Sequence, residues 1–341
     1  MKNIYNETLD SLKETLSRHN FKAFAARQIF EWLYKHQVTS FEEMTNISKD
    51  LRVFLHEKYQ FERLFMFTRQ VAKDGTKKYL FRLHDDHLIE SVLMHHDYGD
   101  SLCITTQVGC NIGCSFCASG LQKRIRNLTI AEMVMQVTEV QNKEKVRISH
   151  VVIMGTGEPF DNYDNVMGFI DVINDPFGLE IGARHITVST SGIVPKIYAF
   201  ADQNKQVNLA VSLHAPNNKI RSSIMKINES YPLKELIKAV KYYLGQTNRR
   251  VTFEYILLDQ INDTIEHANQ LSDLLRGLNC YVNLIRYNAV EEFNFQASVE
   301  DQASKFYKQL IKRGIQATLR REMGADIDAA CGQLRTNALK K

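Results

Sequence analysis

Short apolar runs alternate with amphipathic stretches over most of the chain, and this alternation limits the possible folds more than any other feature. The apolar runs cover 103–108, 150–155, 185–190, 207–214, 251–258 and 281–287, and helical periodicity marks 129–141, 163–173, 232–244, 264–277 and 299–313. Apolar strands separated by helices pair in parallel, with the helices covering the sheet. The pattern predicts an α/β fold, a partial (β/α)6 barrel, with an open doubly wound sheet as the alternative. Residues 317–322 would add an edge strand.

Two smaller segments precede the predicted barrel. Residues 1–60 carry apolar residues at helical spacing and predict a small helical domain. Residues 61–100 change to strand-like patterns on both sides of Asp74-Gly75, a pair that suits a tight turn with positive φ, and they predict a β-hairpin extension. The barrel would then occupy residues 101–341.

The composition is that of an ordinary globular protein, with 44% hydrophobic and 24% charged residues. The 43 lysines and arginines against 39 aspartates and glutamates give a net charge of +4, which excludes a histone-like polycation but allows a local basic surface. No apolar run approaches the roughly 18 residues of a transmembrane helix, and the first residues do not form a signal peptide. We therefore expect a cytoplasmic protein without membrane contact.

Three of the six cysteines form the run Cys110-x3-Cys114-x2-Cys117. Thiolates at this spacing converge only if the backbone loops around a common centre. Iron–sulfur clusters take cysteines at such spacings, normally four per cubane, so three would leave one iron open to a substrate or cofactor. The alternative is a zinc ion held by these three cysteines with Cys103 or a histidine.

A glycine-rich turn, Gly155-Thr-Gly157-Glu158, follows the second apolar run. Glycine lets a backbone approach a ligand closely, and a carboxylate there can accept a hydrogen bond from an ammonium group. By itself such a turn is more often a plain connection between a strand and a helix.

Three motifs together resemble the radical S-adenosylmethionine (SAM) enzymes that methylate RNA. They are the cysteine run with Phe116 before its last cysteine, the segment 211–218 (VSLHAPNN) and the segment 326–334 (DIDAACGQL). The chain is similar to the RlmN family of dual-specificity 23S rRNA and tRNA adenine C2 methyltransferases, with the Cfr-type C8 methyltransferases as sisters. The resemblance covers nearly the whole chain, including its helical start.

The resemblance implies a covalent radical mechanism that uses two SAM molecules per turnover. Cys331 would first receive a methyl group, and a radical formed from the second SAM would convert that group to a methylene radical that attacks adenine C2. Cys103 would release the RNA by forming a transient disulfide with Cys331, and Glu90 would accept a proton.

The resemblance also assigns the cofactor ligands. A [4Fe–4S] cluster would bind to Cys110, Cys114 and Cys117, and SAM would contact Gly157, Glu158, Ser189, Ser212, Leu213, His214 and Asn288. The residues assigned to SAM lie near the ends of predicted strands, where barrel active sites are found.

The partners implied by the resemblance are 23S rRNA, tRNA and an electron donor of the flavodoxin or ferredoxin type. We expect the protein itself to be a monomer. The helices of residues 1–60 would bind RNA. Basic residues at 123–126, 249–250 and 320–321 would form a phosphate-binding rim if they converge on the active-site face. The target adenine must leave its stack to reach a radical, so we expect base flipping.

Two alternatives stay open on the sequence. One is Cfr-type C8 methylation of 23S rRNA, which confers antibiotic resistance; Gly120 and Arg286 lean that way, whereas Pro159 and the segment 320–322 (RRE) resemble the C2 group. The other alternative, from a different class, is a non-catalytic RNA-binding module stabilised by zinc.

Overall fold

The computed structural model describes residues 1–334, so the end of the predicted 101–341 segment lies outside the described residues. A ten-stranded mixed sheet has the strand order β14-β13-β12-β11-β10-β9-β6-β5-β4-β3. Its parallel part consists of β6 (Gly99–Cys103), β9 (Ile148–Ile153), β10 (Ile186–Thr190), β11 (Asn208–Ser212), β12 (Val251–Leu257), β13 (Cys280–Arg286) and β14 (Ala317–Leu319). The predicted α/β fold is confirmed, with β14 as the added edge strand.

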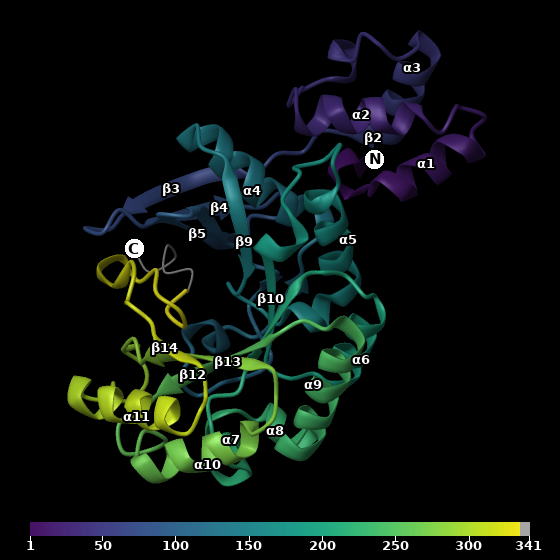
Figure 1. Ribbon diagram of the computed structural model, residues 1–341. Helices are drawn as coiled ribbons and strands as arrows, with labels where there is room; N and C mark the ends of the chain where they lie inside the picture. Colours follow the sequence, from purple (N-terminus) through teal and green to yellow (C-terminus); the bar gives the residue numbers. More distant parts are fainter. Residues whose placement is uncertain (335–341) are drawn as a thin grey trace.

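Helices follow the parallel strands along the chain and lie outside the curved sheet, where α6, α9, α10 and α11 are clearly visible in Figure 1. The α-helices of this part are α4 (Ile130–Glu144), α5 (Tyr163–Asn174), α6 (Val194–Asp202), α7 (Asn218–Ile224), α8 (Ile227–Ser230), α9 (Leu233–Thr247), α10 (Ile265–Leu275) and α11 (Glu300–Lys312). Short 3₁₀ helices are η3 (Ala118–Leu121), η4 (Pro159–Asn162), η5 (Ala183–His185) and η6 (Ala325–Ile327). This arrangement leaves the carboxyl ends of the parallel strands for a site.

Three antiparallel strands extend the sheet beyond β6: β3 (Phe65–Val71), β4 (Lys77–Arg82) and β5 (Leu88–His96). The turn between β3 and β4 contains Asp74-Gly75, where Gly75 has φ +87 and the Thr76 amide donates to Asp74 Oδ1 at 2.9 Å. The Asp-Gly turn therefore forms as its residue types predict, because glycine adopts positive φ without a Cβ clash.

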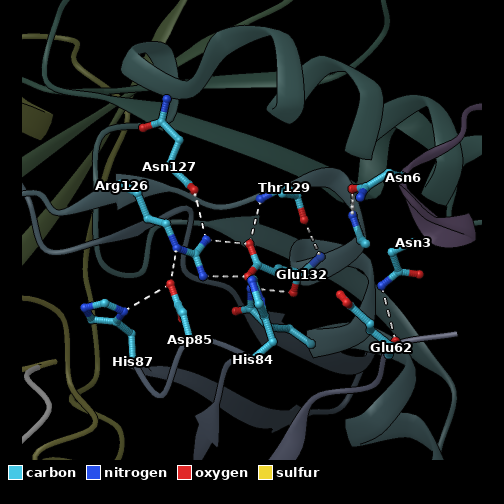
Figure 2. Close-up of polar contacts among 12 residues, drawn as sticks. Asn3, Asn6, Glu62, His84, Asp85, His87, Arg126, Asn127, Thr129 and Glu132 are labelled. Atoms are coloured by element: carbon cyan, nitrogen blue, oxygen red, sulfur yellow. Dashed lines mark hydrogen bonds and ion pairs between the residues drawn. The ribbon is translucent and has the colours of Figure 1, made fainter. Parts of the chain in front are cut away.

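The first sixty residues fold into a helical unit at one end of the molecule (Figure 1). It contains α1 (Leu9–Arg18), α2 (Ala25–Tyr34) and α3 (Lys49–Lys58), the 3₁₀ helices η1 (Ile4–Asn6) and η2 (Phe41–Glu43), and a parallel pair of β1 (Lys2–Asn3) with β2 (Tyr59–Gln60). The unit shares one continuous apolar core with the sheet. At the contact, the Ala131 amide at the start of α4 donates to Asn6 Oδ1 at 2.9 Å, as Figure 2 shows.

The first predicted strand of the barrel was placed too late. Residues 103–108 were expected to form it, but β6 ends at Cys103, and only β7 (Gln107–Val108) is extended again, paired with β8 (Arg126–Asn127). Gln136 Oε1 accepts a hydrogen bond from the Thr105 amide at 2.9 Å and Gln136 Nε2 donates to the Thr105 carbonyl at 3.0 Å, so a side chain replaces the strand ladder there. As a result, the chain leaves the sheet at Cys103.

None of the helices in residues 1–334 is long and apolar enough to cross a lipid bilayer.

Candidate active site

The loop that carries Cys110, Cys114 and Cys117 lies directly beyond β7 and folds back on itself. The Cys110 amide donates to the Gln122 carbonyl at 2.9 Å, and the Cys117 amide donates to the Cys114 carbonyl at 3.2 Å. Gly109 begins the loop with φ +76, and a Cβ at this position would lie 2.8 Å from the Gln122 carbonyl oxygen. These bonds hold the two ends of the loop together, and we call residues 109–122 the cluster loop.

The three thiols are electrostatic neighbours. Burial raises the pKa of Cys110 to about 11, and Cys117 adds to the rise. Burial also raises the pKa of Cys114 well above its usual value, helped by Cys117 and Cys110. Thiols in this setting become thiolates only beside strong positive charge, such as that of iron ions. Three adjoining thiols are donors of the kind that a [4Fe–4S] cluster requires, so these residues fit it. Within residues 1–334, no group of three or more His, Cys, Asp or Glu side chains is arranged to hold a single metal ion.

Gly157 and Glu158 follow β9 and pack against the residues beyond β6. Gly157 has φ +111, and a Cβ there would come within 2.7 Å of the Gln107 side chain. The buried Glu158 carboxylate accepts hydrogen bonds from the amides of Ser191 at 2.7 Å and Phe160 at 3.0 Å. Burial raises the pKa of Glu158, and these two amides oppose the rise. A buried carboxylate of this kind suits a ligand ammonium, as expected for the amino group of SAM.

Arg221 is a central residue that the sequence analysis missed. Its fully buried guanidinium donates to the carbonyls of Ser191 at 2.6 Å, Ser212 at 3.2 Å and Leu213 at 3.2 Å. Burial lowers its pKa to about 10. Arg221 thereby joins the carboxyl ends of β10 and β11, where predicted SAM contacts lie. The available signal was a charged residue three positions before the buried Ile224, on the inner face of α7.

The other two predicted SAM contacts on this side, Ser189 and His214, are also nearly buried. Ser189 lies in β10 opposite Ala210 of β11. The His214 ring accepts a hydrogen bond from the Ile256 amide at 3.0 Å and meets the Phe116 ring edge-on, with ring centres 5.0 Å apart. Burial lowers the pKa of His214 to about 3, so the ring is neutral at ordinary pH. His214 therefore connects the end of β11 to the cluster loop.

Cys331 lies in a loop that contacts the cluster loop directly. The Gly332 carbonyl accepts from the Ala118 amide at 2.8 Å. The carbonyl of Cys331 accepts from Asn288 Nδ2 at 3.2 Å, which places this predicted SAM contact beside Cys331. We call residues 324–334 the Cys331 loop. Its contacts with η3 and with the end of β13 hold it over the carboxyl ends of the parallel strands.

Cys103, at the end of β6, belongs to one apolar cluster with Ala329 and Leu334 of the Cys331 loop. Burial raises the pKa of the Cys103 thiol to about 12, and the neighbouring Cys331 thiol adds to the rise. The pKa of Arg320 is raised chiefly by Cys331, with smaller contributions from Glu254 and Cys103. The structure therefore brings the two predicted catalytic thiols together, with Arg320 close to both.

Glu90, on β5, lines a cavity of about 210 Å³ together with Ser119, Thr156 and Leu334. The cavity thus lies among the cluster loop, the turn after β9 and the Cys331 loop. It is smaller than the roughly 300–1,000 Å³ of pockets for drug-sized ligands. Lys78, on β4, lies with its Nζ 3.5 Å from Glu90 Oε1.

The structure removes several basic residues from the predicted phosphate-binding rim. Figure 2 shows Arg126 between Asp85 and Glu132, to which it donates at 2.6 Å and 2.8–2.9 Å. Residues 249–250 precede β12 and lie at the amino ends of the parallel strands, opposite the cluster loop. The prediction of one phosphate-binding rim is therefore wrong for Arg126, because carboxylates already pair with its charge. It is also wrong for residues 249–250, because they lie at the opposite end of the parallel strands. Lys123 is exposed just past the cluster loop.

Family models match both parts of the chain. The model of the Radical SAM superfamily matches residues 104–271, and the model of the ribosomal RNA large subunit methyltransferase N-terminal domain matches residues 2–60. A crystal structure of a radical SAM methyltransferase from Sphaerobacter thermophilus superposes with a TM-score of 0.90 and 43% sequence identity, covering 98% of this chain and 99% of that one. Fold and site together define a radical SAM enzyme.

Curated relatives narrow this class. A protein of Bacillus subtilis (strain 168) named "Probable dual-specificity RNA methyltransferase RlmN" is 54% identical over 97% of this chain and 92% of its own length. A protein of the same name from Enterococcus faecalis is 56% identical over 99% of this chain and 97% of its own length. The chain belongs to the RlmN family of radical SAM RNA methyltransferases.

This membership decides between the alternatives that the sequence left open. It implies a [4Fe–4S] cluster and SAM as cofactors and rejects the zinc-stabilised binding module. It does not favour C8 methylation, because the similar curated relatives carry the RlmN name. Arg286 was one of the residues that favoured the C8 group in the sequence analysis. In the structure its Nε donates to the Ser298 carbonyl at 3.2 Å, and its Nη1 lies 3.7 Å from Glu322 Oε1.

Proposed function

We propose that this enzyme methylates C2 of adenine in 23S rRNA and in tRNA next to the anticodon. C2 lies between two ring nitrogens, is electron-poor and offers no lone pair to a sulfonium methyl group. A carbon radical can add there, whereas ordinary displacement from SAM cannot proceed. The relatives named dual-specificity RNA methyltransferases support two classes of RNA substrate.

The position of the Cys331 loop is the observation that carries this proposal. On one side it bonds to the cluster loop through Gly332 and Ala118. On the other side it packs against Cys103 in a shared apolar cluster. A methyl group on Cys331 would thus lie between the predicted source of radicals and the predicted resolving thiol.

Each residue has a defined step in the proposed mechanism. When bound, SAM and the cluster supply a methyl group and a radical that abstracts hydrogen. Cys331 takes the methyl group, this methyl group loses one hydrogen atom to the radical, and the resulting methylene carbon bonds to C2. One electron leaves the adduct for a one-electron carrier of the flavodoxin or ferredoxin type, and the C2 proton passes to Glu90. Cys103 then gives up its thiol proton as its sulfur attacks the Cys331 sulfur, the bond from that sulfur to the methylene carbon breaks, and this carbon takes up one proton to become the product methyl, which balances the proton that Cys103 released.

The partners follow from this chemistry. The disulfide that Cys103 and Cys331 form must be reduced by a cellular dithiol, and the flavodoxin or ferredoxin type of carrier must deliver the initiating electron. One chain contributes every residue of the proposed site, so we infer a monomer. Because rRNA and tRNA are the substrates, we place the enzyme in the cytoplasm, with its helical residues 1–60 assisting RNA binding.

Analysis of the methyladenosine isomer tests the proposal. RNA from cells that lack or overproduce the enzyme is digested to nucleosides and resolved by chromatography and mass spectrometry. We expect 2-methyladenosine to disappear from 23S rRNA and tRNA in the deletion strain. Exclusive change of the 8-methyl isomer would reject the C2 assignment.

A further inference from the structure

The hairpin of β3 and β4 contacts the Cys331 loop at three points, two from its turn and one from β4, and the proposed function does not use these contacts. Asp74 Oδ2 accepts from the Gly324 amide at 2.9 Å, and Asp326 Oδ2 accepts from the Lys73 amide at 3.1 Å. At the third point, Lys78 Nζ donates to the Asp328 carbonyl at 3.2 Å. In Figure 1 the yellow C-terminal segment lies beside this end of the antiparallel strands.

The Lys78 contact differs from the other two because the same side chain also forms an ion pair with Glu90. Its Nζ lies 3.5 Å from Glu90 Oε1, and the two side chains are only 10% and 5% exposed. A buried ammonium needs polar partners for its three protons, and here a backbone carbonyl accepts a hydrogen bond while the Glu90 carboxylate lies within ion-pair distance. One side chain therefore connects the predicted base on β5 with a residue three positions before Cys331.

We propose that Lys78 is a positioning residue that fixes Glu90 relative to the Cys331 loop. This inference rests on the proposed roles of Glu90 and Cys331. The base must meet the C2 proton only after C2 has become bonded to the Cys331 methylene carbon, so the distance from Glu90 to the loop determines whether the adduct can lose its proton. A charged side chain attached to both keeps that distance through the reaction.

The part of the Cys331 loop that Lys78 contacts is a tight turn. Gly324 has φ +67 and Asp328 has φ +51, so the turn between them begins and ends in the left-handed region. It is closed by the Ala329 amide, which donates to the Gly324 carbonyl at 3.0 Å. The side chain of Lys78 reaches the carboxyl end of this turn, next to the residues that carry Cys331.

The test compares Lys78→Met with Lys77→Met in the holoenzyme. Lys77 is the adjacent residue on β4 and also pairs with a glutamate, with its Nζ 2.6 Å from Glu144 Oε2. Each variant therefore loses one ammonium and one ion pair, but only Lys78→Met changes the contact with the Cys331 loop. Three products are followed with SAM and an RNA oligonucleotide: methylated Cys331 by peptide mass, RNA-linked protein on a denaturing gel, and free 2-methyladenosine.

We expect Lys78→Met to methylate Cys331 normally and to accumulate RNA-linked protein, which resolves on the order of tenfold to a hundredfold more slowly than in the parent enzyme. Lys77→Met should resolve at the parent rate. Glu90→Ala should show the same stall, and the double variant with Lys78→Met should be no slower than Glu90→Ala alone. Lys78→Arg should recover part of the rate, since a guanidinium can reach both acceptors.

A second measurement needs no cofactor. Amide hydrogen exchange in residues 324–331 should be faster in Lys78→Met than in Lys77→Met. If Lys78→Met does not accumulate as folded protein, Lys78→Gln replaces it in the product assay, where it should also resolve the adduct slowly, because its amide can still donate to the Asp328 carbonyl while the charge beside Glu90 is lost.

Parent-like resolution of the adduct in Lys78→Met, or additive losses in the double variant, would overturn the inference while leaving the proposed function intact. If Glu90→Ala itself resolves the adduct at the parent rate, the role of Glu90 fails, and the inference fails with it. Normal turnover by Cys331→Ala would instead reject the proposed function as a whole.

Discussion

The two cysteine-bearing loops of the site differ in how far along the sequence their main partners lie. The cluster loop closes on itself between Cys110 and Gln122, through contacts between residues near one another in the sequence. The Cys331 loop is held by partners from distant elements, among them Ala118, Asn288 and Lys78. A short-range sequence motif can therefore predict the cluster loop, whereas the conformation of the Cys331 loop depends on the assembled barrel.

The largest expected effect is the loss of activity when a cysteine of either loop is replaced, and the iron content should distinguish the two loops. Cys114→Ala and Cys331→Ala should both abolish product, but only Cys114→Ala should lose the iron and the brown colour, since Cys331 is not a predicted cluster ligand. Iron content, visible absorption and methyladenosine yield are measured on anaerobically purified protein. Cys280→Ala, in the apolar core, is the matched control and should keep both properties. Methylation by Cys331→Ala would rule out the covalent mechanism.

Removal of Cys103 tests whether the Cys331 loop works with the end of β6. Cys103→Ala should form the bond to RNA but not release it, because no second thiol attacks the Cys331 sulfur. RNA-linked protein should therefore accumulate on a denaturing gel. A variant that runs free of RNA after reaction would contradict this assignment.

The different burial of the two thiols predicts a pH-dependent difference in labelling. The pKa of Cys103 is raised to about 12, so its thiol keeps its proton well above neutral pH and reacts slowly with alkylating agents. Cys331 is exposed. At pH 8 iodoacetamide should label Cys331 at least a hundredfold faster than Cys103, and labelling of Cys103 should rise tenfold per pH unit up to its pKa. Equal rates by peptide mass spectrometry would show that Cys103 is not shielded in solution.

A stability measurement tests the junction between β10 and β11, on the side of the cluster loop. Arg221→Met should lower the free energy of unfolding by about 3 kcal/mol, because three backbone carbonyls lose a buried charged donor. Urea denaturation of the cluster-free protein measures this change. Arg276→Met, on an exposed side chain, is the control and should leave the free energy of unfolding nearly unchanged. A small loss for Arg221→Met would mean that water replaces the guanidinium.

The smallest effect concerns glycine at the start of the Cys331 loop. Gly324 and Gly75 both have positive φ, but a Cβ on Gly324 would lie 2.8 Å from the Ala329 Cβ, whereas a Cβ on Gly75 would meet no atom of the described residues within 4 Å. Gly75→Ala should cost about 1 kcal/mol of stability and Gly324→Ala about 2 kcal/mol. Only Gly324→Ala should also lower turnover severalfold. Equal turnover in the two variants would mean that the loop tolerates this shift.

Much of the fold could be predicted because it depends on local patterns. Apolar runs and helical periodicity placed β9 to β13 and the helices α4, α5, α9, α10 and α11 close to their observed positions. The prediction failed at residues 103–108, where a buried glutamine from α4 bonds to the backbone of Thr105. A partner from another element cannot be seen in a hydrophobic pattern.

The candidate site shows the same division. Gly157, Glu158 and the predicted cluster cysteines could be proposed because they belong to short motifs that resemble those of a known family. Arg221 was missed because it acts through backbone carbonyls, and its own sequence context shows only a charged residue in a short helix. Arg126 was misjudged for the reverse reason: its charge suggests RNA, but Asp85 and Glu132 already neutralise it.

By itself the sequence determined the type of fold and the chemical family and predicted the trio of cluster thiols, because these depend on residue identity at short spacing. Only the tertiary structure decided that Arg221 joins two strand ends and that Lys78 lies between Glu90 and the Cys331 loop. Such contacts arise when distant segments are buried against one another, where each polar group must find a partner that no local pattern specifies.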